Sequence, residues 1–599
     1  MFILPSASLS ATIPDSREYD KGEELLQELI KLKPRFEKIY QNWQRDVSDE
    51  KHEYPETVDG KYKKAGIVPF NRNYILYTYD RSIPTPEEVN KEFSAEMALG
   101  EYEPLSISFW ALDNIHDLKI KAGEFKNING DKFSSNNIDI YNVISIPIAY
   151  SRKYLNRETE AMKKHIYEIQ PAFLVKLKSV PVRKNNSIQI LLDFKSTSET
   201  VPGVYKGSIT VQADDREVYE IPITLAVHDF VLDDVPHWQR GLFQKGLPSV
   251  EVLKLEKEWG FNSIAYWWFN GGHFYFGNAR KGKLLFKSGT GGIGYHLENM
   301  RKAGFGNSWV YFLMHKGFSS AVGNWTNTKY PSEAYREQYT KALKYLFDYC
   351  NENKYPLPVL VPTDEPADNN VEKFLKEASW ISKDLKSAKI YTVVFKKDDY
   401  KIYRNRKYLN LWVTNNPDPD KMRAAEENGS EFGIYRGVHI KRPIADTRFQ
   451  YGFKSFWFDA GYTFGWANGF IRKNDPFFDF VGKEGFGHSV IYEMPSGPIP
   501  TLNLLALREA IDDRRYVETL IKKKSLSETS FINELKKKIF SKMIPEGPYY
   551  PKDLPQWVDP WTYGQIIQTQ NPVFMDEWRR EIAREILTDD NNKLQFLQK

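Results

Sequence analysis

The sequence predicts a multidomain protein in which an all-β part is followed by an α/β part. We expect an N-terminal β-sandwich preceded by a helical segment, then a (β/α)8 TIM-like barrel and a helical C-terminal extension. Two changes in the spacing of apolar residues along the chain predict this order. The length of 599 residues allows roughly three to four domains of ordinary size. The expected domains are residues 1–60, 61–236, 237–500 and 501–599.

The N-terminal segment has apolar residues at helical spacing. Residues 22–47 include Leu25, Leu29 and Phe36 in such a pattern, with Pro34 inside it. Proline in a helix interior removes one backbone hydrogen bond and clashes with the preceding turn. We therefore expect one helix or two, interrupted near Pro34.

Short apolar segments replace the helical spacing between about residues 65 and 236. Gly, Pro, Asn and Asp separate these segments, which include SISFWAL, IQILLDF, GSITVQA and YEIPITLAV. Short strands of this kind, with turn residues between them, are typical of a β-sandwich.

Strands then alternate with amphipathic stretches from about residue 237. Eight segments are strand candidates: GLFQKG, NSIAYWWFNG, NSWVYFLMH, PVLVPTDEP, AKIYTVVF, LNLWVTNN, EFGIYRG and GYTFGWANG. Alternation of strands with helices indicates right-handed βαβ units and a parallel sheet. Eight candidates over roughly 250 residues fit a (β/α)8 barrel. A doubly wound open sheet stays possible, although no glycine-rich phosphate fingerprint follows the first strand.

Composition limits the classes of partner and cofactor. The formal net charge of +4 is too small for this length to indicate nucleic acid, and no stretch is long and apolar enough for a membrane span. Cys350 is the single cysteine, which excludes an internal disulfide and favours a structural role for that thiol. No His and acid residues cluster at ligand spacing, so we expect no metal and no cofactor. The chain is rich in aromatic residues, with 15 Trp, 36 Tyr and 37 Phe.

The carboxyl ends of the barrel strands are the expected place for a site, because catalytic residues of such barrels gather there. The strand ends carry Trp267, Asn270, His315, Asp364, Glu365, Asn415, Tyr435, Arg436, Trp466 and Asn468. Aromatic rings stack on sugars, and amides bond to sugar hydroxyls. We therefore expect a carbohydrate substrate, with Asp364 and Glu365 as catalytic residues and the others as substrate-binding residues. Structural roles for Trp267, His315, Asn415 and Arg436 remain alternatives.

The adjacent acids Asp364 and Glu365 predict an unusual mechanism. Most glycosidases use two carboxylates on opposite sides of the sugar, but the seventh strand, EFGIYRG, has no acid at its carboxyl end. Adjacent acids fit substrate-assisted catalysis, in which the 2-acetamido oxygen of the sugar attacks the anomeric carbon. Glu365 would then protonate the leaving oxygen while Asp364 orients the acetamido group.

Two alternatives to this mechanism remain open. The substrate could lack an acetamido group, and Asp446 or Asp459, in the connection after the seventh strand, would then act as the second carboxylate. The chain could also be a carbohydrate-binding protein without catalytic activity.

Four segments resemble glycoside hydrolase family 123 and its wider sister group. They are GEYEPLSISFWALDNIHDLKI, VPGVYKGSITVQA, the DEP after the fourth strand, and LLALREAIDDRRYVETL. These landmarks span about residues 90 to 520. The resemblance implies a β-N-acetylgalactosaminidase-like enzyme, with Glu365 as acid/base and Asp364 as the acetamido-orienting residue. It also implies a periplasmic or secreted location, although the N-terminus MFILPSASLSATIP is not a convincing signal peptide.

Overall fold

The computed structural model describes most of the chain in separate stretches. These are residues 16–46, 60–148, 165–216, 218–244, 248–266, 293–306, 309–313, 322, 328–363, 365–366, 369–393, 406–415, 417, 419–438, 440, 442–469, 489–524, 533–537, 539 and 572–588.

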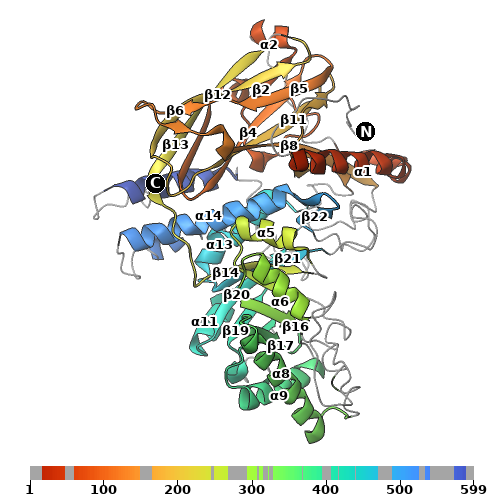
Figure 1. The fold of residues 1–599 in the computed structure, drawn as a ribbon, viewed down its shortest axis with the longest axis vertical. Coiled ribbons are helices and arrows are strands. Elements are labelled where there is room, and N and C mark those ends of the chain that lie inside the picture. The colour runs from red at the N-terminus through yellow and green to blue at the C-terminus, as the bar shows by residue number, and fades with distance from the viewer. Residues whose placement is uncertain are drawn as a thin grey trace, which may run out of the picture.

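Two β-sheets form the first half of the chain, at the top of Figure 1. The six-stranded sheet has the order β1 (Gln44–Arg45), β9 (Ile166–Val175), β8 (Ile138–Ile148), β11 (Ser187–Lys195), β4 (Tyr102–Ala111) and β2 (Ile67–Phe70). The second sheet has the order β10 (Val180–Val182), β5 (Ile115–Ala122), β12 (Gly203–Ala213), β13 (Tyr219–Val231) and β3 (Phe93–Leu99), with β6 (Phe125–Lys126) and β7 (Lys132–Phe133) beside β12. Ile107 and Phe109 of the first sheet share one buried core with Ile209 and Val211 of the second. The two sheets are therefore two layers around a common apolar interior.

Short helices lie in the same half of the chain. They are α2 (Gly60–Ala65), α3 (Pro86–Asn90), and the 3-10 turns η1 (Tyr74–Leu76) and η2 (Ser135–Asn137). The described part of residues 65–236 therefore consists mainly of strands and loops, in agreement with the short strands expected there.

The N-terminal helix α1 (Ser16–Tyr40) is continuous, so the expected interruption near Pro34 is wrong. Apolar side chains on both sides of the proline, Leu29 and Phe36 among them, are buried in one cluster with Ile148 and Phe173 of the first sheet. This packing holds both halves of the helix on the same surface, and it offsets the backbone hydrogen bond that Pro34 cannot make.

Eight parallel strands form the sheet in the second half of the chain. In chain order they are β14 (Gln239–Gln244), β15 (Ser263–Tyr266), β16 (Trp309–Leu313), β17 (Pro358–Val361), β18 (Tyr391–Val393), β19 (Leu411–Thr414), β20 (Glu431–Gly437) and β21 (Tyr462–Asn468). Neighbours in sequence pair in parallel except β17 and β18, and β14 also pairs with β21. A parallel bridge between Leu360 and Ile390 links β17 to the β18 side. All eight strand candidates of the sequence are confirmed as strands.

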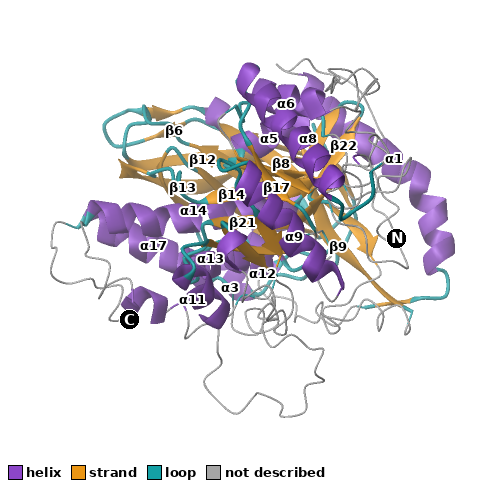
Figure 2. Ribbon diagram, turned by 90° about the horizontal axis from the view of Figure 1, so that it is seen from below, coloured by secondary structure: helices purple, strands orange, loops and turns teal. Residues whose placement is uncertain are grey.

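Helices cover the outside of this sheet (Figure 2). They are α5 (Val250–Glu258), α6 (Ile293–Lys302), α8 (Glu333–Glu352), α9 (Asn369–Asp384), α11 (Pro419–Glu427), α12 (Ile444–Tyr451) and α13 (Phe453–Trp457), with η5 (Arg406–Tyr408) before β19. Cys350 is buried on α8, and burial raises the pKa of its thiol to about 12, so the thiolate is disfavoured.

Side chains alternate between the two faces of the eight strands. Phe243, Val361, Val413 and Tyr435 belong to one small interior cluster, whereas their strand neighbours pack outward against the helices. The outward neighbours include Leu242, Leu360, Trp412 and Ile434. This two-residue period fixes which residue at each strand end can face the interior.

The C-terminal helices α14 (Leu502–Lys523) and α17 (Phe574–Leu587) lie between the two-sheet half and the eight-stranded sheet (Figure 1). The hairpin β22 (Ile491–Met494) and β23 (Gly497–Pro500) leads into α14. The helical character expected for the C-terminal extension is confirmed in these two segments.

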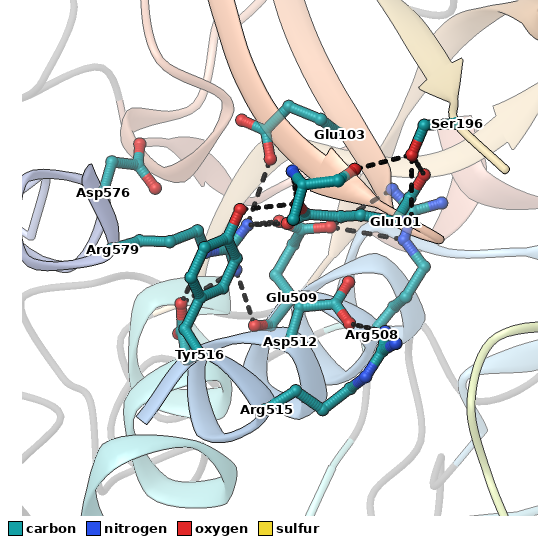
Figure 3. Close-up of polar contacts among 12 residues, drawn as sticks. Glu101, Glu103, Ser196, Arg508, Glu509, Asp512, Arg515, Tyr516, Asp576 and Arg579 are labelled. Carbon is teal, nitrogen blue, oxygen red and sulfur yellow. Dashed lines mark hydrogen bonds and ion pairs between the residues drawn. The ribbon is translucent and has the colours of Figure 1, made fainter. Parts of the chain in front are cut away.

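A network of buried charges joins these helices to the first half of the chain (Figure 3). Arg508 of α14 donates two parallel hydrogen bonds, both 2.7 Å, to the carboxylate of Asp193 on β11. Arg579 of α17 donates to Glu103 of β4 at 3.0 Å and to Glu509 of α14 at 2.8 Å. Charge-assisted hydrogen bonds thus join elements from distant parts of the sequence. Arg508 bonds to one carboxylate through two parallel bonds, and Arg579 bonds to more than one carboxylate.

We expect Arg508→Met to destabilise the protein by about 3–5 kcal/mol, because it leaves the Asp193 carboxylate buried without its cation. The exposed fractions of the two side chains are 3% and 4%. Arg336→Met, which breaks the more exposed pair with Asp384 on the outer helices, should cost about 0–1 kcal/mol. Urea denaturation of both variants measures the difference. Equal losses would contradict the role assigned to the Arg508 pair.

Candidate active site at the carboxyl ends of the parallel strands

Glu365 lies just beyond the end of β17, where the sequence predicts the catalytic acid. Thr363 is buried at the strand end, and the Glu365 side chain is exposed two residues later. The backbone of Glu365 has φ 38°, in the left-handed region that side chains other than glycine seldom adopt. Backbone strain of this kind is a recurrent feature of functional sites.

Tyr435 and Glu365 meet across the sheet. The hydroxyl of Tyr435, on the inner face of β20, donates a hydrogen bond of 2.5 Å to Oε1 of Glu365. The sequence predicted both residues for the site, and the fold brings them together from positions 70 residues apart. The bond fixes one oxygen of the carboxyl group and leaves the other for a ligand.

Aromatic side chains line the interior below this pair. The ring of Phe243 lies 5.9 Å from that of Tyr435 and 5.3 Å from that of Trp466, which is partly buried. Phe464 lies 5.5 Å from Phe243 one layer deeper. Tyr435 and Trp466 were expected here, whereas Phe243 was missed. The sequence could have indicated Phe243, because it lies near the end of the first strand, GLFQ, at an alternate position that faces inward.

Asn415 directly follows β19 and is partly buried. It shares the inward phase of Leu411 and Val413 on the same strand. Its position therefore agrees with the expected place of an amide at this edge of the sheet.

Arg436 has the opposite phase from Tyr435, so its side chain points outward from the sheet. It is buried, and its backbone N–H and carbonyl both bond to the hydroxyl of Tyr451 on α12. Burial by itself would raise the pKa of Asp446, but the cations of Arg436 and Arg442 hold it below its ordinary value. This placement favours the alternative of a structural charge for Arg436, and its substrate-binding role stays a prediction.

Asn468 uses its amide within the protein. Its Nδ2 donates to Gln244 at 3.2 Å and to Glu256 at 3.3 Å, while its Oδ1 accepts from Ser489 at 2.9 Å and from the N–H of Ile491 at 3.2 Å. These bonds tie the end of β21 to α5, to Ser489 and to the first residue of β22. They favour a structural role, and substrate binding by Asn468 stays a prediction.

The loop acids considered as alternative nucleophiles lie elsewhere. Asp459 precedes β21, at the amino end of the strands, and its side chain pairs with Lys536. Asp446 is buried on α12 and accepts from Arg442 at 2.9 Å and from Gln450 at 3.1 Å. Neither position presents a free carboxylate beside Glu365.

Four of the predicted site residues, Asp364, Trp267, Asn270 and His315, lie outside the described residues.

A buried acid that the sequence did not signal supports the first and last strand ends. Glu256 on α5 accepts a 2.7 Å hydrogen bond from Gln244, the last residue of β14, besides the bond from Asn468. Burial raises the pKa of Glu256 to about 8, although the two bonds partly oppose this rise. The carboxyl group therefore stays protonated at neutral pH and bonds as a neutral group.

We expect Glu256→Gln to flatten the dependence of stability on pH. The pKa of Glu256 lies above its ordinary 4.5 in the folded chain, so its contribution is complete below pH 4.5 and is lost as the pH rises through about 8. The full loss between these two pH values is on the order of 5 kcal/mol. Melting temperatures from pH 4.5 to 8.5 measure it, with the exposed Glu251→Gln on the same helix as the control. Parallel curves for wild type and Glu256→Gln would contradict the assignment.

Within the described part of the chain, no group of three or more His, Cys, Asp and Glu side chains is arranged to hold a metal ion. The helices that the structure describes are also too short or too polar to cross a membrane.

Comparisons of sequence found no matching family model and no matching curated protein. The fold is similar to the solved structure of a family 123 glycoside hydrolase from Clostridium perfringens, with a TM-score of 0.62 and 13% identity. The match covers 87% of this chain and 99% of that one. A Bacteroides ovatus family 5 xyloglucanase matches with a TM-score of 0.28 and 7% identity, over 71% of this chain and 99% of that one, too low a score to support an argument. The likeness expected from the sequence motifs is thus confirmed at the level of the fold, which is similar to that of a family 123 glycoside hydrolase.

Proposed function

We propose that the protein is a glycoside hydrolase that cleaves a β-linked 2-acetamido sugar at the carboxyl ends of the eight strands. One observation carries the proposal: the exposed carboxyl group of Glu365 accepts a hydrogen bond from Tyr435 at this edge, above Phe243 and Trp466. An accessible acid beside aromatic rings suits a sugar, which has apolar faces for stacking. The fold likeness to a glycoside hydrolase supports the same class of reaction.

The proposed architecture is the one expected from the sequence. The parallel pairing of all eight strands in chain order, with β14 beside β21 and a bridge between the β17 and β18 sides, supports a (β/α)8 barrel. The common core of the two N-terminal sheets supports a β-sandwich. In this arrangement the barrel is the catalytic unit, and residues 61–236 and 237–500 remain the proposed domains.

The proposed reaction has two steps. In the first, the acetamido oxygen of the substrate attacks the anomeric carbon while Glu365 gives its proton to the departing glycosidic oxygen. In the second, Glu365 takes a proton from water, which attacks the same carbon and opens the oxazolinium ion. Asp364 accepts a hydrogen bond from the acetamido nitrogen and stabilises its positive charge. Two inversions give net retention of the anomeric configuration.

Tyr435 orients Glu365 in this scheme. Its hydroxyl holds Oε1, so that Oε2 carries the proton that is transferred. Trp466 and Phe243 would stack on the sugar, and Asn415 would bond to its hydroxyls. Trp267, Asn270 and His315, which follow β15 and β16 in the chain, complete the proposed set of ligands for the carbohydrate.

A panel of aryl β-glycosides tests the reaction: N-acetylgalactosaminide, N-acetylglucosaminide, galactoside and glucoside. We expect release from an acetamido sugar alone, with kcat/KM reduced about 10²- to 10⁴-fold in both Glu365→Gln and Asp364→Asn. Release from a plain sugar, or full activity in Asp364→Asn, would overturn the substrate-assisted mechanism. Binding of the sugar without release, unchanged in Glu365→Gln, would favour a carbohydrate-binding protein.

We expect Tyr435→Phe to reduce kcat/KM about 10- to 100-fold, because it removes a hydrogen bond to the catalytic carboxyl group. Tyr355→Phe is the matched control. Tyr355, which precedes β17, donates a similar hydrogen bond of 3.0 Å to Glu298 on α6, away from the proposed site. Steady-state kinetics on the best substrate of the panel measures both. Equal effects of the two variants would exclude an orienting role for Tyr435.

A further inference from the structure

Arg442 is a partly exposed cation at the end of β20 that the proposed reaction does not use. It follows β20 by five residues and precedes α12, and 26% of its side chain is exposed. Its Nη1 donates a 2.9 Å hydrogen bond to Oδ2 of Asp446. Among the described residues this carboxylate is the one partner of the guanidinium group.

The other edge of the Arg442 guanidinium has no protein partner in the described chain. Its Nε is enclosed and makes no hydrogen bond, and no bond is formed by Nη2. A buried donor without a partner is unfavourable, and its position is one that a hydrogen-bonding ligand could fill. The Nε and Nη2 groups together form the planar edge that binds a carboxylate or sulfate with two parallel bonds.

Gly437 leaves this edge uncovered on the side of the site. Gly437 is two residues from Tyr435 on β20, so both share the inward phase of the strand. A Cβ atom at Gly437 would lie 3.6 Å from Nη2 and 3.9 Å from Nε of Arg442, and 3.7 Å from the carbonyl oxygen of Trp466. The Nε–Nη2 edge therefore lies beside the inner face of the strand that carries Tyr435 and beside the backbone of Trp466.

The local charges favour an anion at this edge. The negative charge of Asp446 is already opposed by Arg442 on one side and by the nearby Arg436 on the other. Helix α12 starts at Ile444 with no side-chain hydrogen bond capping it, so its first N–H groups add positive potential next to Arg442.

We propose that Arg442 is a specificity-determining residue that binds a carboxylate or sulfate group of the substrate through its Nε–Nη2 edge. The inference rests on the proposed function, since it places an anionic sugar at the edge where Glu365 acts. The anion can be a sulfate on the sugar that is cleaved off or the carboxylate of a uronate linked to it.

Calorimetric binding to the Glu365→Gln chain tests the proposal without turnover. The probes are N-acetylgalactosamine, its 6-sulfate, and a disaccharide in which N-acetylgalactosamine is β-linked to glucuronate. We expect one of the two anionic probes to bind about 10- to 100-fold more tightly than the neutral sugar, and the tighter of the two identifies the source of the anion. The preference should fall as the salt concentration rises.

Two further variants separate binding from structure. Arg442→Met should abolish the preference for the anionic probe, and Arg442→Lys should keep part of it. Because Arg442→Met leaves Asp446 buried without its cation, Gly437→Leu is the second test. Its Cβ fits at 3.6 Å, and its outer atoms would cover the Nε–Nη2 edge while the ion pair with Asp446 remains. Arg336→Met on the outer helices is the control for loss of an arginine.

Equal binding of the neutral and both anionic probes would overturn the proposal, as would a preference that survives both Arg442→Met and Gly437→Leu. These outcomes are independent of the glycoside panel. Cleavage of neutral glycosides without an anion preference would retain the proposed function and reject the role of Arg442. An anion preference lost in the variants, with no cleavage of any glycoside, would retain Arg442 as a ligand and reject the hydrolase.

Discussion

The buried ionic network around Arg579 and Arg508 is the interaction on which the rest of the structure depends. Charges removed from water are tolerated only when they are paired and hydrogen-bonded, so each element that contributes a charge is committed to one position. Arg579 on α17 contacts Asp513 on α14 at 2.8 Å, and Arg448 on α12 donates to the same carboxylate. Since α12 follows β20, the network connects the C-terminal helices, the two-sheet half and the strand that carries Tyr435.

Carboxyl groups outnumber guanidinium groups in this network. Protonation of some carboxyl groups removes part of the excess negative charge. Burial raises the pKa of Glu101 to about 8, although Arg579 opposes the rise, and the carboxyl group of Glu101 accepts a 2.6 Å hydrogen bond from Tyr516. The segments GEYEP and ALREAIDDRRYVETL, which carry the family resemblance, supply much of the network. These two segments therefore join the halves of the molecule, while the proposed chemistry lies at the strand ends.

The site combines aromatic side chains from strands that are distant in the sequence. Phe243, Tyr435 and Trp466 come from the first, seventh and eighth strands and meet because the sheet brings β14 beside β21. Glu256 and Asn468 fix the ends of those strands from outside, through bonds to Gln244. Such hydrogen bonds hold in place the strand ends that carry the proposed sugar-binding side chains, and a precise binding site needs this support.

The sequence by itself determined the strands, the helices and the strand end that bears Glu365, because apolar spacing and turn residues are local signals. Only the tertiary structure decided which of two neighbours faces inward. Tyr435 and Arg436 are both large and polar-tipped, and packing of the whole sheet sets the phase that separates them. The same holds for Pro34, which stays helical because α1 packs against β9. It also holds for the hydrogen bond between Asn468 and Glu256, which are 212 residues apart in the sequence. Arg442 gave no signal in the sequence, since its place depends on the turn after β20 and on the missing side chain of Gly437.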